Sequence, residues 1–390
     1  MTLDKTKNNL NVPPLRFPGF TEEWEKIKVS DLLNFYSTNS LSWEMLNYEG
    51  GDFLNLHYGL IHSGLPTLID LKKDILPFVN ENALPKKYSL CKEGDVAFAD
   101  ASEDTNDVAK AVEFINLDGQ QVISGLHTIH GRDNENKTVL GFKGYAFASS
   151  AFHNQIRRIA QGTKIYSISS KSFDEVFIGV PTKAEQIKIA RLLHLIDERI
   201  TTQNKIIDNL QSLIKGLAKA LTHQGEANTR ISDCLTCHTS TLQEGALNQS
   251  GEFPVYGASG IAGFLDDYRC DEDSILVIKD GSGAGTVSYA TGEYSVIGTL
   301  NYLTAQPEYS LKYLYFCLMS FNFEPFKTGM AIPHIYFKDY GRAKIYCPSY
   351  SEQMKIATFI SAYENKLHIE KSILSNLILH KQYHLMNLFI

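Results

Sequence analysis

One stretch of the chain, residues 182–221, limits the possible folds more than any other. Its apolar residues are spaced alternately four and three positions apart, which is typical of a helix that packs along a second helix. They are Ile189, Leu193, Ile196, Ile200, Ile207, Leu210, Ile214, Leu217 and Leu221. A polar residue, Gln203, interrupts this apolar seam once. At a rise of about 1.5 Å per residue the helix would be a rod of roughly 55 Å, which requires a partner along its seam.

The start and the end of this helix are marked in the sequence. Thr182 and Glu185 stand three residues apart directly after Pro181, and this spacing predicts a capping box in which each side chain binds the other residue's exposed backbone amide. Gly225 follows the last seam residue and is suited to the left-handed turn that ends many helices.

The same pattern returns 167 residues later, where P-S-Y-S-E-Q-M-K-I-A at 348–357 repeats P-T-K-A-E-Q-I-K-I-A at 181–190. Ser349 and Glu352 form the second predicted capping box. The second seam consists of Ile356, Ile360, Tyr363, Leu367, Leu374, Leu377 and Leu388. Glu370 takes the place of Gln203, so two antiparallel helices would bring these two polar side chains together at mid-length. An internal repeat therefore organises the chain.

Composition restricts the class of protein. The chain has 390 residues, of which 43% are hydrophobic, enough for two or three domains. It has neither a long uncharged apolar run nor the apolar core of a signal peptide, so we expect a cytoplasmic protein without membrane contact. Six irregularly spaced cysteines indicate reduced thiols. The net charge of −7 argues against a simple nucleic-acid coat protein but allows local basic surfaces.

The order of these segments predicts four parts. Residues 1–180 would hold an N-terminal arm, extended over 12–24, and a first domain with a sheet. Residues 181–225 would form the first long helix. Residues 226–347 would form a second domain and residues 348–390 the second long helix. We therefore predict an α+β chain in which two mixed α/β domains alternate with two long antiparallel helices, an intramolecular coiled coil with pseudo-two-fold internal symmetry. The two domain inserts differ in length and sequence, which suggests similar roles on different targets.

Two motifs suggest chemistry, and each has a structural alternative. Cys234-x-x-Cys237-His238 has the spacing of a haem attachment site or half a zinc site, but no second ligand pair accompanies it, so we expect buried thiols and no metal. The K-D-G-S-G-A-G-T stretch contains Gly281, Gly283 and Gly285. It matches no nucleotide fingerprint, so a turn between two strands is favoured over a phosphate site, and close approach to DNA phosphates stays open.

No catalytic motif is recognisable in the sequence, so we expect a protein that performs no chemistry itself. Basic residues do occur beside aromatic and polar ones, a composition that suits contacts to phosphates and base edges although it is common on solvated faces. Lys164 and Tyr166 lie just before the first helix, and His334 and Tyr336 lie near the matching position before the second.

Three features together resemble the specificity subunit of type I restriction-modification systems. They are the arm P-P-L-R-F-P-G-F with Trp24, the two P-[TS]-x-x-E-Q-x-K-I-A boxes, and the stretch G-T-K-I-Y-S-I-S. The resemblance covers essentially the whole chain, and V-Y-G-A-S-G-I-A-G at 255–263 is similar to the family's second recognition domain. It implies two target recognition domains that each read half of a bipartite double-stranded DNA site. It also implies that the helices bind two modification (methyltransferase) subunits, which restriction subunits then join.

On this interpretation the chain binds no cofactor, and the other subunits use S-adenosylmethionine, ATP and Mg²⁺ to methylate adenine and cleave DNA. The candidate DNA-binding residues are Tyr58, His62, Lys86, Lys87, His127, Arg132, Lys164, Tyr166, Tyr256, Ser259, Lys279, Ser282, Lys327, His334 and Tyr336. The candidate helix-pair and subunit-binding residues are Ile189, Leu193, Ile196, Gln203, Ile356, Ile360 and Glu370. The alternative is a scaffold whose two domains bind proteins and read no DNA.

Overall fold

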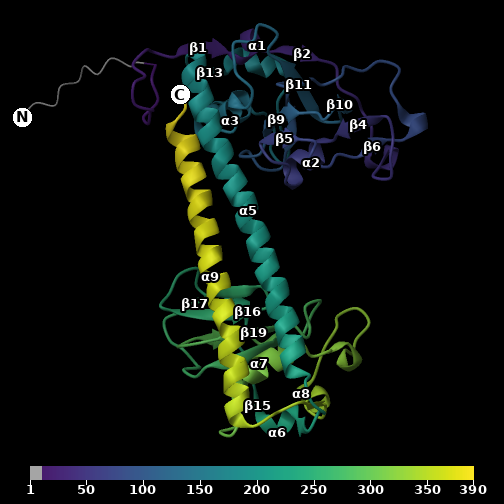
Figure 1. Ribbon diagram of the computed structural model, residues 1–390, viewed down its shortest axis with the longest axis vertical. Coiled ribbons are helices and arrows are strands. Elements are labelled where there is room, and N and C mark those ends of the chain that lie inside the picture. Colours follow the sequence, from purple (N-terminus) through teal and green to yellow (C-terminus); the bar gives the residue numbers. More distant parts are fainter. Residues whose placement is uncertain (1–10) are drawn as a thin grey trace, which may run out of the picture. The chain divides into compact units, whose positions relative to one another are not determined.

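The structure is a computed structural model that describes residues 11–390, and Figure 1 labels many of its elements. The chain divides into two compact units. The first unit comprises the chain up to residue 202 together with residues 374–390, and the second comprises residues 203–373. Each unit contains one sheet-bearing domain and about half of each long helix, α5 (Lys183–Thr222) and α9 (Tyr350–Asn387). The predicted class, α+β with two long antiparallel helices, is confirmed.

The first unit is built on a five-stranded sheet in the order β2-β11-β7-β9-β5. These strands are β2 (Asn34–Tyr36), β5 (Leu68–Asp70), β7 (Val96–Ala99), β9 (Ala111–Asn116) and β11 (Thr128–Arg132). The central strand β7 is buried at every position, because Phe98 faces an aromatic layer while Ala97 and Ala99 face a second apolar cluster. A strand covered on both faces has no polar side, which explains its continuous apolar run.

Smaller elements complete the first unit. A four-stranded sheet has the order β10-β4-β6-β3, and two strand pairs, β1-β13 and β12-β8, flank the sheets. The strands are β1 (Glu25–Lys28), β3 (Leu46–Asn47), β4 (Phe53–Leu56), β6 (Phe78–Val79), β8 (Ala101–Ser102), β10 (Gln121–Ser124), β12 (Tyr166–Ser167) and β13 (Phe177–Val180). The helices are α1 (Val29–Leu32), α2 (Tyr58–Ser63), α3 (Phe142–Phe147) and α4 (Ser150–Ile159), with short 3-10 turns at Trp43–Met45, Glu81–Ala83 and Ser170–Glu175.

The second unit has a four-stranded sheet, β15-β21-β18-β19, and a three-stranded sheet, β17-β16-β20. Its strands are β14 (Thr229–Arg230), β15 (Leu235–Thr239), β16 (Phe253–Gly257), β17 (Gly260–Leu265), β18 (Ser274–Ile278), β19 (Val287–Ala290), β20 (Ser295–Val296), β21 (Leu300–Ala305) and β22 (Lys344–Ile345). Its helices are α6 (Ile231–Cys234), α7 (Leu311–Met319) and α8 (Phe337–Tyr340), with 3-10 turns η4 (Glu244–Ala246) and η5 (Glu324–Phe326). Strands β14 and β22 pair as β1 and β13 do in the first unit.

The two long helices pack against each other within each unit. In the first unit Lys381 Nζ lies 2.6 Å from Asp197 Oδ1, and Ile189 and Leu193 share a core with Leu388. In the second unit Gln203 is fully buried and its amide donates to the Glu370 carboxylate and, over 3.0 Å, to the Glu370 carbonyl. The predicted meeting of Gln203 and Glu370 is thus confirmed. None of the helices within residues 11–390 has the length and apolarity needed to span a membrane.

The internal repeat extends to individual hydrogen bonds. Gln186 Nε2 donates to the Pro181 carbonyl over 2.8 Å, and the equivalent Gln353 donates to the Pro348 carbonyl over 2.9 Å. Each glutamine also accepts one backbone N–H of its own domain, from Val139 in the first unit and from Ser310 in the second. The two glutamines therefore tie each long helix to the domain that precedes it.

The two predicted capping boxes have different outcomes. Ser349 and Glu352 form theirs, since the Ser349 hydroxyl donates to Glu352 Oε2 over 2.8 Å and the Glu352 amide donates back to that hydroxyl over 3.4 Å. The prediction of a capping box at Thr182 and Glu185 is wrong. Both Glu185 oxygens instead accept from Arg16 of the N-terminal arm, over 2.7 and 2.8 Å. A bidentate guanidinium binds a buried carboxylate more strongly than a neutral amide does, so the arm takes the carboxylate that would have capped the helix.

The prediction of an ordered, non-helical arm is confirmed over the described part, from residue 11 onward. The Leu15 amide donates to the Asn387 carbonyl over 2.9 Å, and the buried Trp24 ring lies edge-on to Phe389. Lys188 of α5 lies over the Phe17 and Phe20 rings. The arm therefore joins the beginning of α5 to the end of α9 within the first unit.

Candidate nucleic-acid interface

The same backbone arrangement occurs once in each domain, and we call it the recognition frame. In the first domain the Asp100 amide donates to the His127 carbonyl over 3.0 Å, and the Asp100 carbonyl accepts from the Ile168 amide over 2.9 Å. In the second domain Lys279 takes the place of Asp100, because its amide donates to Thr299 and its carbonyl accepts from Ile335 over the same two distances. The frame thus links three segments: the end of a central strand (β7 or β18), the loop before the neighbouring strand of the same sheet (β11 or β21), and a hairpin.

The hairpin of each frame has matching geometry. Backbone amides and carbonyls pair Gln161 with Ser167 in the first domain, and Thr328 with His334 in the second. Gly162 and Gly329 have φ of 140° and 90°. A Cβ on Gly162 would lie 1.8 Å from the Ile165 carbonyl oxygen, so only glycine allows this tight turn. The strict turn places an exposed apolar residue at each tip, Ile165 in the first domain and Ile332 in the second.

The side chains on the two frames differ. Asp100 Oδ1 lies 3.2 Å from His127 Nδ1 in the first frame, whereas Lys279 and Thr299 occupy the equivalent positions in the second. Ser167 in the first hairpin corresponds to His334 in the second, and His334 Nδ1 lies 2.8 Å from Asp280 Oδ1. One frame therefore presents an acidic residue where the other presents a basic one.

Aromatic and imidazole rings gather beside the first frame, around Tyr58 at the start of α2. Its ring centroid lies 5.1 Å from that of His127, 6.0 Å from that of His62 and 4.7 Å from that of His57. Burial, reinforced by the neighbouring His127, lowers the pKa of His57, and the ring's Nδ1 accepts the Gly59 amide over 3.1 Å. His57 is therefore a neutral ring that fixes the start of α2.

Two hollows flank His127. One, of about 470 Å³, is lined by Tyr58, His62, His127 and the hairpin tip Ile165, together with the acids Glu103, Asp104 and Asp107. The other, of about 660 Å³, brings Lys87 together with Asp100, His127 and the polar run Thr38, Asn39 and Ser40. Such a mixture of rings, amides, hydroxyls and charges can stack on bases and exchange hydrogen bonds with their edges. Four predicted residues, Tyr58, His62, Lys87 and His127, are thus brought together, and the exposed Lys86 adjoins them.

Arg132 is partly buried, and its charge is engaged by an internal carboxylate. Its guanidinium donates to both oxygens of the buried Asp95 over 2.7 Å and stacks over Tyr36. Burial opposes the charge on Asp95, but the hydrogen bonds from Arg132 and His130 prevail and hold the pKa of that carboxyl below its ordinary value. Arg132 therefore neutralises an internal carboxylate. Lys164 is exposed on the first hairpin, and Tyr166 lies in β12.

In the second domain the candidates lie in several separate places. Lys279, Ser282 and His334 belong to the frame or the glycine-rich turn, and Tyr336 is exposed beside Lys338. The turn connects β18 to β19, as expected, and the Gly281 amide donates to the Pro333 carbonyl over 2.9 Å. Tyr256 and Ser259 lie on β16 and in the turn after it. Lys327 is paired with Glu324 over 2.6 Å.

The Cys347 thiol lies beside Cys234, but among the described residues the motif forms no cluster with the geometry of a metal site. Cys234 is buried in the apolar core, while His238 stacks on Tyr302 and bonds to Thr304. Within residues 11–390 the one cluster with metal-ligand chemistry is Cys91, Asp95 and His130. The cluster does not fit a cation, because the Arg132 guanidinium already occupies both Asp95 oxygens.

Asp100 and Thr299, which complete the frames, are not among the residues predicted from the sequence. A usable signal exists for Asp100 and Lys279, since each is the first charged residue after a buried apolar strand, β7 or β18. Thr299 carries no such signal, because only the hydrogen bond from Lys279 identifies it.

The comparisons with known proteins agree with this architecture. The family model described as "Type I restriction modification DNA specificity domain" matches residues 21–212 and 229–378, and the chain therefore belongs to this family. Specificity subunits of type I systems are non-catalytic DNA-recognition subunits, in agreement with the expectation from sequence.

Individual relatives are more distant. A putative type I restriction enzyme specificity subunit of Haemophilus influenzae is 25% identical over 120 residues, which cover 30% of this chain and about a third (31%) of that relative. The S subunit of a type I system from M. genitalium has the same fold, with a TM-score of 0.58, 19% identity and coverage of 97% of this chain and 99% of that one. A chain from a study of "complex assembly" and "conformational transition" of the type I system also has a TM-score of 0.58, at 14% identity, with coverage of 96% and 98%.

Proposed function

We propose that this chain is the DNA-reading specificity subunit of a type I restriction-modification complex. Residues 1–180 and 226–347 each read one half of a bipartite site in double-stranded DNA. The long helices, in residues 181–225 and 348–390, hold two modification subunits, and restriction subunits join the assembly in the cytoplasm. The chain itself binds no cofactor. Adenine methylation and cleavage are the work of the other subunits, which use S-adenosylmethionine, ATP and Mg²⁺.

The observation that carries this proposal is the pair of recognition frames. Asp100 and Lys279 occupy equivalent backbone positions but have opposite charges. The backbone of the frame is therefore repeated, whereas the side chain at this position is not. A carboxylate accepts from the amino group of cytosine, whereas a lysine donates to the acceptors of guanine. Two copies of one frame with different side chains suit a protein that holds two half-sites in the same manner and reads different bases in them.

Exposed apolar residues on the long helices support the proposed subunit contacts. In the second unit Met354, Phe359 and Ile369 of α9 are 42%, 49% and 57% exposed. In the first unit Leu379 and Tyr383 are similarly exposed, at 59% and 55%. Apolar side chains that project from a helix pair into solvent are typical of surfaces that another polypeptide covers. The seam residues Ile189, Leu193, Ile196, Ile356 and Ile360 then serve the pairing of α5 with α9.

Methylation-sensitive sequencing of DNA modified by the complete complex tests the proposal directly. A bipartite motif with two different halves is expected. Asp100→Asn should alter the preference in one half only, and Lys279→Gln should alter the other half only, since glutamine favours adenine over guanine. Exchange of residues 30–160 for those of another specificity subunit should replace one half-site. Unchanged specificity after this exchange would contradict the assignment.

The scaffold alternative predicts a different result in the same system. A chain that binds only proteins would still co-purify with the modification subunits, but nuclease footprinting would show no protected split site. Footprints over two separated half-sites, which disappear when either domain is exchanged, would exclude the scaffold.

A further inference from the structure

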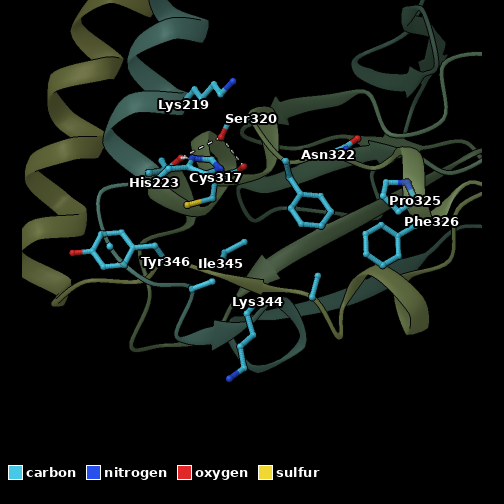
Figure 2. Close-up of a pocket in the computed structure, with 15 residues that line it drawn as sticks. Lys219, His223, Cys317, Ser320, Asn322, Pro325, Phe326, Lys344, Ile345 and Tyr346 are labelled. Atoms are coloured by element: carbon cyan, nitrogen blue, oxygen red, sulfur yellow. Dashed lines mark hydrogen bonds between the residues drawn. The ribbon is translucent and has the colours of Figure 1, made fainter.

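A cavity of about 490 Å³ lies in the second unit, between the end of α5, the loop after α7 and strand β22 (Figure 2). Aromatic rings, among them Phe326 and Tyr346, form part of its wall. Its basic groups are Lys219, His223 and Lys344, and no Asp or Glu lines it. The cavity is thus apolar in its depth and basic at its margin, and its volume is within the usual range for a binding site.

Lys344 of β22 lines this cavity, and it pairs with Arg230 of β14 without exchanging hydrogen bonds. Strand β22 pairs with β14 in the register Arg230↔Lys344, and the neighbouring Ala343 and Ile345 carbonyls accept from Ile231 and Asn228. Because hydrogen-bonding groups alternate along an antiparallel pair, the Lys344 N–H and C=O face away from β14. The register therefore leaves both groups outside the hydrogen-bond ladder between β14 and β22. A donor and an acceptor side by side on an open strand edge are a binding point for a planar amide.

The first unit shows what occupies the equivalent place. Phe177 of β13 has the same register against β1 as Lys344 has against β14. Gln155 of α4 accepts the Phe177 N–H over 3.0 Å and donates to the Phe177 carbonyl over 2.8 Å. The second unit has no counterpart of α4, because the chain between α7 and the hairpin that begins at Thr328 forms only the single turn η5. The cavity therefore lies where the first unit places a helix with a carboxamide side chain.

We infer that the cavity receives a helix from a modification subunit, which presents a Gln or Asn carboxamide to the Lys344 backbone and an acidic side chain to the basic margin. This inference rests on the proposed function, which supplies the modification subunit. The carboxamide would complete β22 as Gln155 completes β13. The absence of carboxylates from the lining favours an acidic occupant, and the aromatic wall accepts the apolar residues that neighbour the carboxamide on one helix face.

Amide hydrogen exchange in the chain and in its complex with modification subunits tests the inference. In the free chain the Lys344 amide should exchange rapidly, while the Phe177 amide, held by Gln155, should be protected. The complex should protect Lys344 at least about tenfold and leave Phe177 unchanged. Gln155→Leu is the matched control, because it should expose Phe177 in both states and leave Lys344 as it was.

Three results separate the possibilities. A stable complex in which Lys344 still exchanges rapidly overturns the inference and leaves the proposed function standing. Protection that appears when the free chain is concentrated assigns the cavity to a second copy and also overturns it. Failure of the chain to bind modification subunits at all refutes the proposed function, and the inference falls with it.

A pair of substitutions gives an independent measurement. Ala227 is exposed and lines the cavity, whereas Gln224 is exposed three residues earlier and does not line it. Ala227→Trp should fill the cavity and weaken binding of the modification subunit about tenfold, and Gln224→Trp should leave binding within about twofold. Equal affinities of the two variants would contradict the inference.

Discussion

The ion pair between Arg16 and Glu185 provides the sharpest test of how the arm holds the first unit together. The Glu185 side chain is 1% exposed and that of Arg16 is 14% exposed, so removal of the guanidinium would leave a buried carboxylate without its counter-ion. The bidentate hydrogen bond to Glu185 raises the pKa of Arg16, which keeps the guanidinium charged. Removal of one partner of a buried pair costs about 3–5 kcal/mol, and partial exposure of Arg16 places Arg16→Ala near the lower value.

For a unit of roughly 200 residues, a loss of about 3 kcal/mol corresponds to a fall of roughly 6–12 °C in the unfolding midpoint. Differential scanning calorimetry should show this fall in the transition of the first unit and little change in that of the second. The double variant Arg16→Met with Glu185→Met is the control, because it removes both charges and should recover most of the lost stability. A fall below about 1 °C for Arg16→Ala, or a double variant no more stable than the single one, would refute the reasoning.

Three further measurements test other parts of the structure. Burial lowers the pKa of His153 to about 4, below its ordinary value of 6.5. The free energy of unfolding should therefore keep its full value above pH 6.5 and fall by up to about 2 kcal/mol as the pH drops to 5. Thermal unfolding of His153→Gln should lack this pH dependence. Replacement of Gln203 and Glu370 together by leucine should stabilise the helix pair by roughly 1 kcal/mol, because Gln203 Oε1 is buried and has no hydrogen-bond partner among the described residues. The midpoint of helix unfolding in circular dichroism should therefore rise, and a lower midpoint would contradict this. Lys87→Ala should weaken DNA binding equally for all sequences and reduce the salt slope of binding by about 0.9, whereas a sequence-dependent loss would assign Lys87 to a base.

Much of the architecture followed from the sequence because repetition and periodicity are local signals. The apolar seam predicted both long helices, and the shared interruption at Gln203 and Glu370 predicted their register, which the hydrogen bond between the two confirms. The capping box at Ser349 also followed from spacing alone. The equivalent box at Thr182 did not form, because its fate depended on Arg16, which lies 169 positions away from Glu185 in the chain.

The candidate interface was less accessible to sequence reasoning. Composition selected Arg132 as a basic residue beside histidines, but its role depends on Asp95, a buried acid 37 positions earlier. Asp100 and Lys279 belong together because each takes the same two backbone hydrogen bonds. No similarity between their side chains indicates this relation.

The sequence by itself therefore determined the two helices, their pairing, the duplicated plan and the family, since each depends on residues at fixed short spacings or on one repeated segment. Only the tertiary structure decided which charged groups are neutralised inside the domains, which ones line the recognition frames, and where β22 is left with an open edge. These outcomes depend on hydrogen bonds between segments that are distant in sequence. A side chain's partner across such a distance is fixed by the folded backbone and not by the residues on either side of it.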